Sequence, residues 1–253
     1  GRAALRWGRA WWHIVHLGAL IVTLMLTPSS WRRPWRSAIA DHVWRGSAPV
    51  LLWFGVLSAL VSLVIMRIVL VTAQSYGLSQ YALEMMVRVL VLELIPLTAA
   101  LFVALRVSLP ASVELAALRD SGALARARRE GVDVLREAIV PRAVASLFAV
   151  LLLAALSGVV CLVLAYLLVH GFSPWGRERY TRLVGKVFAP AVSLIFVLKT
   201  LGFAAAVSLI PIGSALHDRS DERVPASLEL QGLVRMFAAL LLIEALSLAG
   251  NYI

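Results

Sequence analysis

Apolar residues gather in five long segments of the chain, with polar residues between them. The segments are roughly Ala48–Val71, Met85–Leu109, Ala143–His170, Val187–Ile212 and Gly232–Ile253. A helix needs about 20 apolar residues to cross the hydrocarbon core of a bilayer, and each segment is that long. A helix also satisfies its backbone hydrogen bonds within a single segment, as the bilayer interior requires. The pattern therefore predicts an all-α integral membrane protein with five transmembrane helices.

A sixth apolar stretch, Trp11–Leu26, follows three arginines and carries tryptophan and histidine near its start. Amphipathic rings beside basic residues favour an interfacial helix that lies among the lipid headgroups. A sixth span is the alternative. The sequence thus divides into an N-terminal interfacial or elbow region, residues 1–46, and a single transmembrane domain, residues 47–253.

The polar run between the second and third apolar segments, about residues 111–140, has a helical composition. Ala, Leu, Arg and Glu dominate it, and two glycines interrupt it. Leucines at helical spacing give it one apolar face, and charges cover the rest. A helical loop of this kind is typical of a docking element, although a solvated loop that only sets the topology is the alternative. The candidate docking residues are Glu114, Arg119, Asp120, Arg128 and Asp133.

Arginine is distributed unevenly over the loops, and this predicts the orientation. The N-terminal region and the run at 111–140 carry most of the arginines, and with five spans both lie on one side. The positive-inside rule then places the N-terminus and this run in the cytosol and the C-terminus outside. The loop Gly171–Lys186 is expected outside, although it is also basic.

The composition and the motifs exclude several classes of function. Hydrophobic residues make up 61% of the chain, charged residues only 15%, and the net charge is +10. In a membrane protein this positive charge indicates topology and phospholipid contact, and we expect no nucleic-acid partner. The single Cys161 excludes a disulfide framework and a cysteine metal cluster. The chain has no G-x-x-x-x-G-K-[ST], H-E-x-x-H or G-x-S-x-G motif, so we expect no catalytic residues and no metal or cofactor of its own.

Charged residues inside the apolar segments are the strongest candidates for a site. An unpaired charge in a span costs a few kcal/mol, so such residues are paired, hydrated or functional. Glu93 lies well inside the second segment, and Pro96 three residues later can kink the helix and open space for a cavity. Lys199 and Glu244 lie centrally in the fourth and fifth segments. They form either a structural ion pair or the polar lining of a pathway.

The stretch from Glu93 to Arg142 resembles the MlaE/YrbE family of lipid ABC transporter permeases. The family patterns R-E-L-G-P, G-R-x-G-S with a following Glu, V-D-P and P-R correspond here to 92–96, 105–108 with Glu114, 132–134 and 141–142. Lys199 and Glu244 also resemble polar residues of the family's last two spans. The chain departs from the pattern at Leu92, Ile95 and Leu105, and at Gly122, where the family's coupling helix usually has Glu.

The resemblance implies a permease subunit, itself not an enzyme, in the bacterial inner membrane. It implies a homodimer of permeases, an ABC ATPase subunit that binds ATP and docks on a cytosolic coupling helix, and an MCE-domain lipid-binding protein on the periplasmic side. The substrate implied is a phospholipid or related lipid, with Glu93, Pro96, Lys199 and Glu244 lining its pathway. Two alternatives stay open. One is an ion-gradient-driven secondary transporter, and the other is a non-transporting membrane anchor or assembly subunit.

Overall fold

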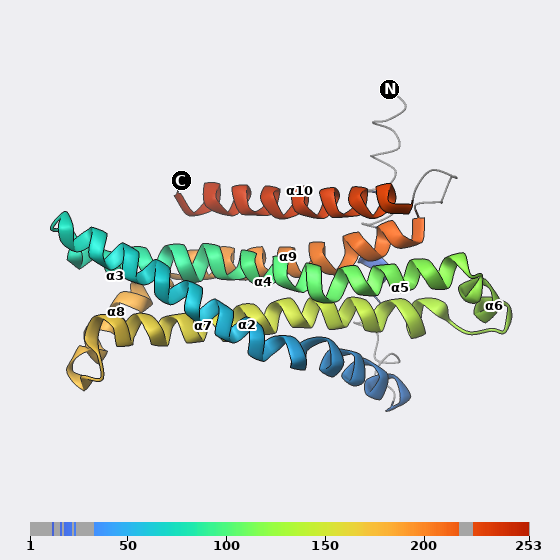
Figure 1. Cartoon of the computed structure of the whole chain (residues 1–253), viewed down its shortest axis with the longest axis horizontal. Helices are drawn as coiled ribbons and strands as arrows, with labels where there is room; N and C mark the ends of the chain where they lie inside the picture. The colour runs from blue at the N-terminus through green and yellow to red at the C-terminus, as the bar shows by residue number, and fades with distance from the viewer. Residues whose placement is uncertain are drawn as a thin grey trace, which may run out of the picture. The chain divides into compact units, whose positions relative to one another are not determined.

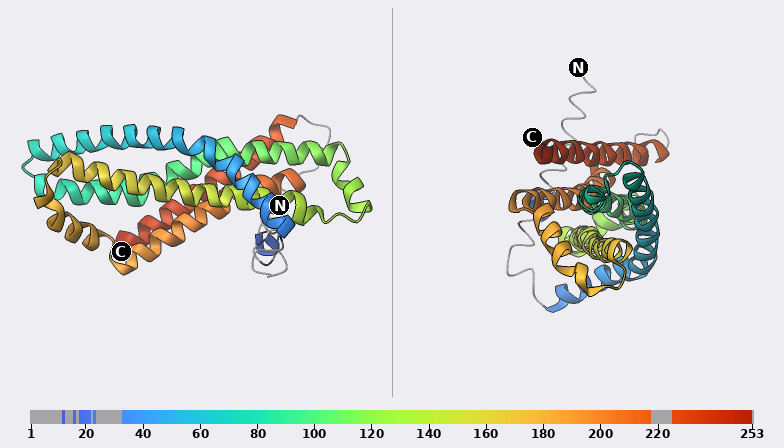
Figure 2. Two further views of the ribbon diagram at one scale, coloured as in Figure 1. Left: turned by 90° about the horizontal axis from the view of Figure 1, so that it is seen from below. Right: turned by 90° about the vertical axis from the view of Figure 1, so that its left-hand side faces the viewer.

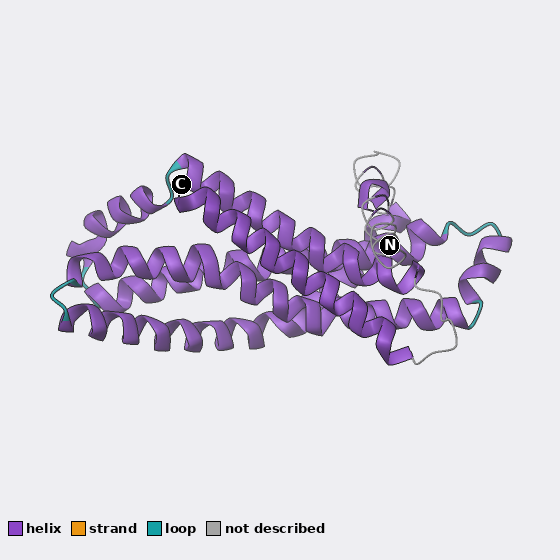
Figure 3. Ribbon diagram, turned by 90° about the horizontal axis from the view of Figure 1, so that it is seen from above, coloured by secondary structure: helices purple, strands orange, loops and turns teal. Residues whose placement is uncertain are grey.

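The fold is built from helices alone in the part of the chain that is described. The structure is a computed structural model that describes residues 12, 16, 18–21, 23, 33–217 and 225–252. Figure 3 draws the described elements as helices joined by short loops. Five helical runs are long and apolar enough to cross a membrane: Leu51–Ser75, Tyr81–Asp120, Leu135–His170, Pro190–Leu216 and Gly232–Asn251. The predicted all-α membrane fold with five spans is confirmed, whereas the predicted interfacial helix Trp11–Leu26 falls largely outside the described residues.

The helices follow one another with short connections (Figure 1). In chain order they are α2 (Arg33–Ser75), α3 (Ser79–Met86), a π-helical stretch (Val87–Leu94), α4 (Ile95–Val103), a second π-helical stretch (Ala104–Ser108), α5 (Leu109–Asp120), α6 (Ala123–Arg129), a third π-helical stretch (Leu135–Ile139), α7 (Val140–His170), a 3-10 turn (Pro174–Gly176), α8 (Arg177–Val187), α9 (Pro190–His217) and α10 (Pro225–Tyr252).

Each π-helical stretch ends just before a proline. The residues that precede Pro96, Pro110 and Pro141 donate their N–H groups five residues back, to the carbonyls of Leu90, Ala104 and Leu135. A proline lacks an N–H group and its ring crowds the carbonyl four residues earlier, so an ordinary α-helix is strained there. The wider π-helical turn accommodates the ring, and the helix continues through all three prolines.

The helix that contains the second span is consequently longer than the sequence predicts. The expected end near Leu109 rested on the charged residues that follow, but the helical run continues to Asp120. Pro110 lies within this run, and the π-helical turn before it accommodates the ring. The docking region at 111–140 is therefore not one separate helix. It consists of α5, α6 and the turn that leads into the third π-helical stretch.

The chain forms two compact units, and each has its own apolar core. The first comprises residues 1–49, 101–149 and 204–241, and the second comprises residues 50–100, 150–203 and 242–253. In the first unit, Leu115 of α5 packs with Val140 of α7 and Ile212 of α9. In the second, Met86, Leu90 and their neighbours pack with α2, α7 and α8. Each unit holds one group of candidate functional residues.

Candidate functional site

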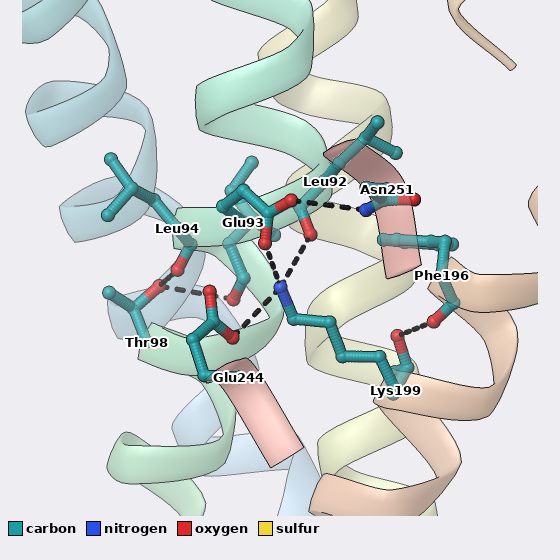
Figure 4. A network of polar contacts seen from close by, with 10 residues as sticks. Leu92, Glu93, Leu94, Thr98, Phe196, Lys199, Glu244 and Asn251 are labelled. Atoms are coloured by element: carbon teal, nitrogen blue, oxygen red, sulfur yellow. Dashed lines mark hydrogen bonds and ion pairs between the residues drawn. The ribbon is translucent and has the colours of Figure 1, made fainter. Parts of the chain in front are cut away.

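Three intramembrane charges come together in the second unit. Glu93 lies on the π-helical stretch Val87–Leu94, Lys199 on α9 and Glu244 on α10. Their side chains are 12%, 2% and 15% exposed. Figure 4 shows the lysine side chain reaching between the two carboxylates. The sequence predicted Lys199 and Glu244 as a pair or a pathway lining, and the structure adds Glu93 to the same cluster.

Lys199 is the centre of this cluster. Its Nζ forms an ion pair with Glu93 Oε2 and another with Glu244 Oε2 at 2.8 Å. It also donates a hydrogen bond to the backbone carbonyl of Leu92 at 3.1 Å. The ring of Phe203 lies 5.8 Å from Nζ, within the range of a cation–π contact. The ammonium group, which can donate three hydrogen bonds, thus has oxygen partners on two other helices.

Pro96 contributes to the cluster through the backbone. In an α-helix the residue at position 96 would donate its N–H group to the carbonyl of Leu92, four residues earlier. Proline has no N–H group and cannot make this bond. Lys199 Nζ donates to this carbonyl from a different helix. The hydroxyl of Thr98 donates to the carbonyls of Leu94 at 2.8 Å and Ile95 at 3.1 Å. Pro96 therefore leaves a backbone oxygen that helps to hold the lysine.

Asn251 is a further member of the cluster that the sequence analysis missed. Its Nδ2 donates to Glu93 Oε1 at 3.4 Å. It follows Glu244 by seven residues, which places both on one face of α10. This spacing was the available signal, but a neutral amide near the end of a span does not stand out in the sequence. Figure 4 shows the contact between Asn251 and Glu93.

The cluster carries two carboxylates and one ammonium group in an apolar environment. Charges attract strongly where the effective dielectric constant is low, so these groups hold three helices together. The arrangement also has more negative than positive formal charge. A cationic group of a ligand, such as the ammonium part of a zwitterionic headgroup, would complement it. These features fit a site where the polar part of an otherwise apolar ligand passes.

The candidate docking residues lie in the first unit. Glu114 Oε2 on α5 accepts from Arg142 Nη2 on α7 at 3.0 Å, and Arg142 also donates to the carbonyl of Ala138 at 2.8 Å. Arg119 Nη1 donates to the carbonyl of Ala215, in the last turn of α9, at 2.5 Å. These residues therefore fix α5 to α7 and α9, in addition to any contact with a partner.

The tip of the docking region presents its charges outward. All three arginines at the end of α6, which include Arg128, are exposed, and α6 buries no residue in the described structure. Asp120 is exposed and pairs with Arg119 at 2.9 Å. Asp133 is also exposed, and its carboxylate accepts from the side chain of Arg136 at 3.2 Å. Among the predicted residues, Arg128 is the one whose position is best suited to contact a partner.

The backbone conformation at position 122 explains why glycine stands where the family's coupling helix usually has glutamate. Gly122 lies between α5 and α6 with φ of +71°, in the left-handed region. A residue with a Cβ pays about 1–2 kcal/mol there, whereas glycine does not. A side chain would meet no neighbour within 4 Å, so the constraint is conformational and not steric. The tight turn between α5 and α6 thus depends on glycine.

Comparison with known families agrees with this architecture. A family model described as Permease MlaE matches residues 39–249. No curated protein matches the chain. The matched region includes the first four spans, all but the last two residues of the fifth, the docking region and the three charged residues of the buried cluster. Because the match covers most of the sequence, the chain belongs to the MlaE permease family.

Proposed function

We propose that the chain is the permease subunit of an ABC transporter that moves phospholipid between the inner membrane and a periplasmic MCE-type lipid-binding partner. The observation that carries this proposal is the buried cluster of Lys199, Glu93 and Glu244 within otherwise apolar spans. Ligand sites are mostly apolar with a few polar groups that fix orientation, and a phospholipid matches that description. A second permease copy would complete the pathway.

The energy for transport would come from a separate ATPase subunit. The sequence has no phosphate-binding loop, and α6 presents exposed arginines at the tip of a region that is firmly attached to α7 and α9. A rigid attachment is what a docking element needs in order to transmit motion to the spans. The ATPase would bind here and hold the ATP.

The buried cluster also supports a second candidate function. Two carboxylates around one amine could relay protons, as acidic residues do in ion-driven transporters. A secondary transporter driven by an ion gradient is therefore the alternative. The two functions differ in their energy source, and this difference can be measured.

Charge reversal on α6 tests the docking of the ATPase. We expect Arg128→Glu to reduce co-purification of the ATPase, because it places negative charge on the exposed tip. Arg177→Glu, an equally large reversal at the start of α8, is the matched control and should co-purify as the native chain does. Arg119→Glu should also reduce binding, but it breaks the contact with Ala215 as well. Unchanged co-purification of the Arg128 variant would count against docking through α6.

A further inference from the structure

The loop between α7 and α8 presents two large aromatic side chains to its surroundings. Phe172 is 95% exposed and Trp175 is 92% exposed. Contacts with the end of α7 nevertheless stabilise the loop. The hydroxyl of Tyr166 donates to the carbonyl of Ser173 at 2.5 Å, and the ring of His170 stacks on Tyr166 with 5.3 Å between centroids. The two aromatics are therefore held outward by a defined loop.

Glycines make this loop conformation possible. Gly171, directly after α7, has φ of +60°, which favours glycine. A Cβ at Gly176 would lie 2.1 Å from Cδ2 of His170, so the chain passes the imidazole ring at a distance that only glycine permits. The outward presentation of the aromatic residues thus follows from a compact turn.

One face of α8 attaches the helix to the second unit. The hydroxyl of Tyr180 donates to the carbonyl of Leu162 on α7 at 2.7 Å. Val187 is completely buried, and Leu183 packs against the same core. Figure 2 shows α8 leading from the end of α7 to the start of α9. The helix is consequently held along the unit instead of projecting away from it.

The outer face of α8 is cationic. Arg179, Arg182 and Lys186 are all exposed and are spaced three and four residues apart, which places them on one face of the helix. Glu178 pairs with Arg182 at 3.3 Å, with both side chains largely exposed. Lysine and arginine near an acidic lipid surface contribute about fivefold each to binding. The surface is thus complementary to the phosphates of acidic phospholipids.

The helical run that ends with α7 is long enough to bring this surface to the headgroups. With the π-helical stretch before it, α7 forms a helical run of 36 residues, Leu135–His170, which spans about 54 Å at 1.5 Å per residue. A bilayer is about 40–45 Å thick including its headgroups. The loop after His170 therefore leaves α7 near the membrane surface, and α9 re-enters apolar sequence at Pro190, soon after α8 ends. Tryptophan favours this interfacial zone, and phenylalanine occurs with it on the membrane-facing side of interfacial segments.

We propose that the α7–α8 loop and the outer face of α8 bind the headgroup layer of the surrounding leaflet. Phe172 and Trp175 insert between lipids, and Arg179, Arg182 and Lys186 bind the phosphates of acidic phospholipids. This explains why a loop expected outside the cell interior is basic. The proposal concerns the lipids around the protein and does not depend on transport or on an ATPase.

Lipid-dependent quenching tests this proposal. A fluorophore is attached at Trp175→Cys in a Cys161→Ala background, and the chain is reconstituted in phosphatidylcholine vesicles with or without phosphatidylglycerol. Brominated lipid should quench this probe, and acrylamide should reach it poorly. Probes at Val159→Cys and Glu130→Cys give the lipid-facing and water-facing references. If acrylamide quenches position 175 as strongly as position 130 in both vesicles, the surface faces water or a protein partner and the proposal is wrong.

Removal of the cations tests the preference for acidic lipid. The triple variant changes Arg179, Arg182 and Lys186 to Gln. In this variant, protection of the probe from acrylamide should require at least about fivefold more phosphatidylglycerol. Arg177→Gln is the matched control, because this residue lies on another side of α8, and it should leave the lipid dependence unchanged. An equal lipid dependence in the triple variant and the control would overturn the assignment of the phosphate-binding residues.

Discussion

At the scale of single residues, Lys199 determines the organisation of the buried cluster. One ammonium group meets two carboxylates and a backbone carbonyl, and it is almost completely buried. Removing one member of a buried ion pair leaves the remaining charge without a partner, which is more costly than replacing the whole group. The cluster should therefore respond differently to partial and complete neutralisation.

Lys199→Met should destabilise the protein by about 3–5 kcal/mol, because it leaves Glu93 and Glu244 facing each other in an apolar environment. Thermal unfolding in detergent measures the loss. Lys186→Met changes the only other lysine in the chain, which is exposed, and should alter stability by about 0.5 kcal/mol or less.

The combined variant of Lys199→Met with Glu93→Gln and Glu244→Gln should recover part of the stability, since no uncompensated charge remains. If the cluster lines the lipid pathway, this variant should still lack lipid flux. Recovery of both stability and flux would show that the three charges are structural only.

Tyr180 gives a second prediction at this scale. Burial raises the pKa of its phenol from 10.0 to about 12, with a smaller contribution from Cys161. The folded state therefore favours the neutral phenol, which donates to Leu162. This contribution to stability is present below pH 10 and is lost as the pH rises through about 12. The difference in tyrosinate absorbance between the native chain and Tyr180→Phe should titrate near 12, and a midpoint near 10 would contradict the buried environment.

At the scale of elements, prolines and π-helical turns shape the long helices. Each π-helical stretch ends just before a proline, and the one before Pro96 also carries Glu93. The extra width lets the helix pass the proline without breaking. At Pro96 it also leaves the Leu92 carbonyl to Lys199. Local backbone geometry and the charged cluster are therefore linked.

Pro96→Ala should weaken the hydrogen bond between Lys199 and the Leu92 carbonyl. Alanine restores an N–H group that can compete with Lys199 for the Leu92 carbonyl, so the reaction of Lys199 with a small amine-specific reagent should become faster. Peptide mass spectrometry measures the rate. Pro110→Ala makes the same change after another π-helical stretch, in the first unit, where the carbonyl four residues earlier belongs to Arg106, and it should leave the rate unaltered. Equal rates in both variants would contradict the role given to Pro96.

The sequence predicted the elements better than their ends or their assembly. Five apolar segments were sufficient to predict five spans, because the bilayer imposes both length and composition. The helix of the second segment continues past its expected end, since the charged residues after Leu109 indicated a break where the helical run in fact goes on to Asp120. Glu93, Lys199 and Glu244 stood out as charges in spans, but their meeting depends on the rotation of each helix. Asn251 and the Leu92 carbonyl joined them without any charge to mark them.

At the scale of the whole molecule, the two units carry different groups of charged residues. The first unit carries the exposed arginines of α6, and the second carries the buried charged cluster. The chain is a member of the MlaE permease family. In our proposal, an ATPase supplies energy at α6, and a phospholipid contacts the cluster during transport. The energy source is thus the central claim.

Lipid flux in reconstituted vesicles tests this claim most directly. The chain is reconstituted with its ATPase and periplasmic partner, and transfer of a labelled phospholipid is followed under two conditions. Depletion of ATP should stop the transfer, whereas an uncoupler that dissipates the ion gradient should leave it unchanged. Transfer that continues without ATP but stops with the uncoupler would contradict the proposal and establish a secondary transporter.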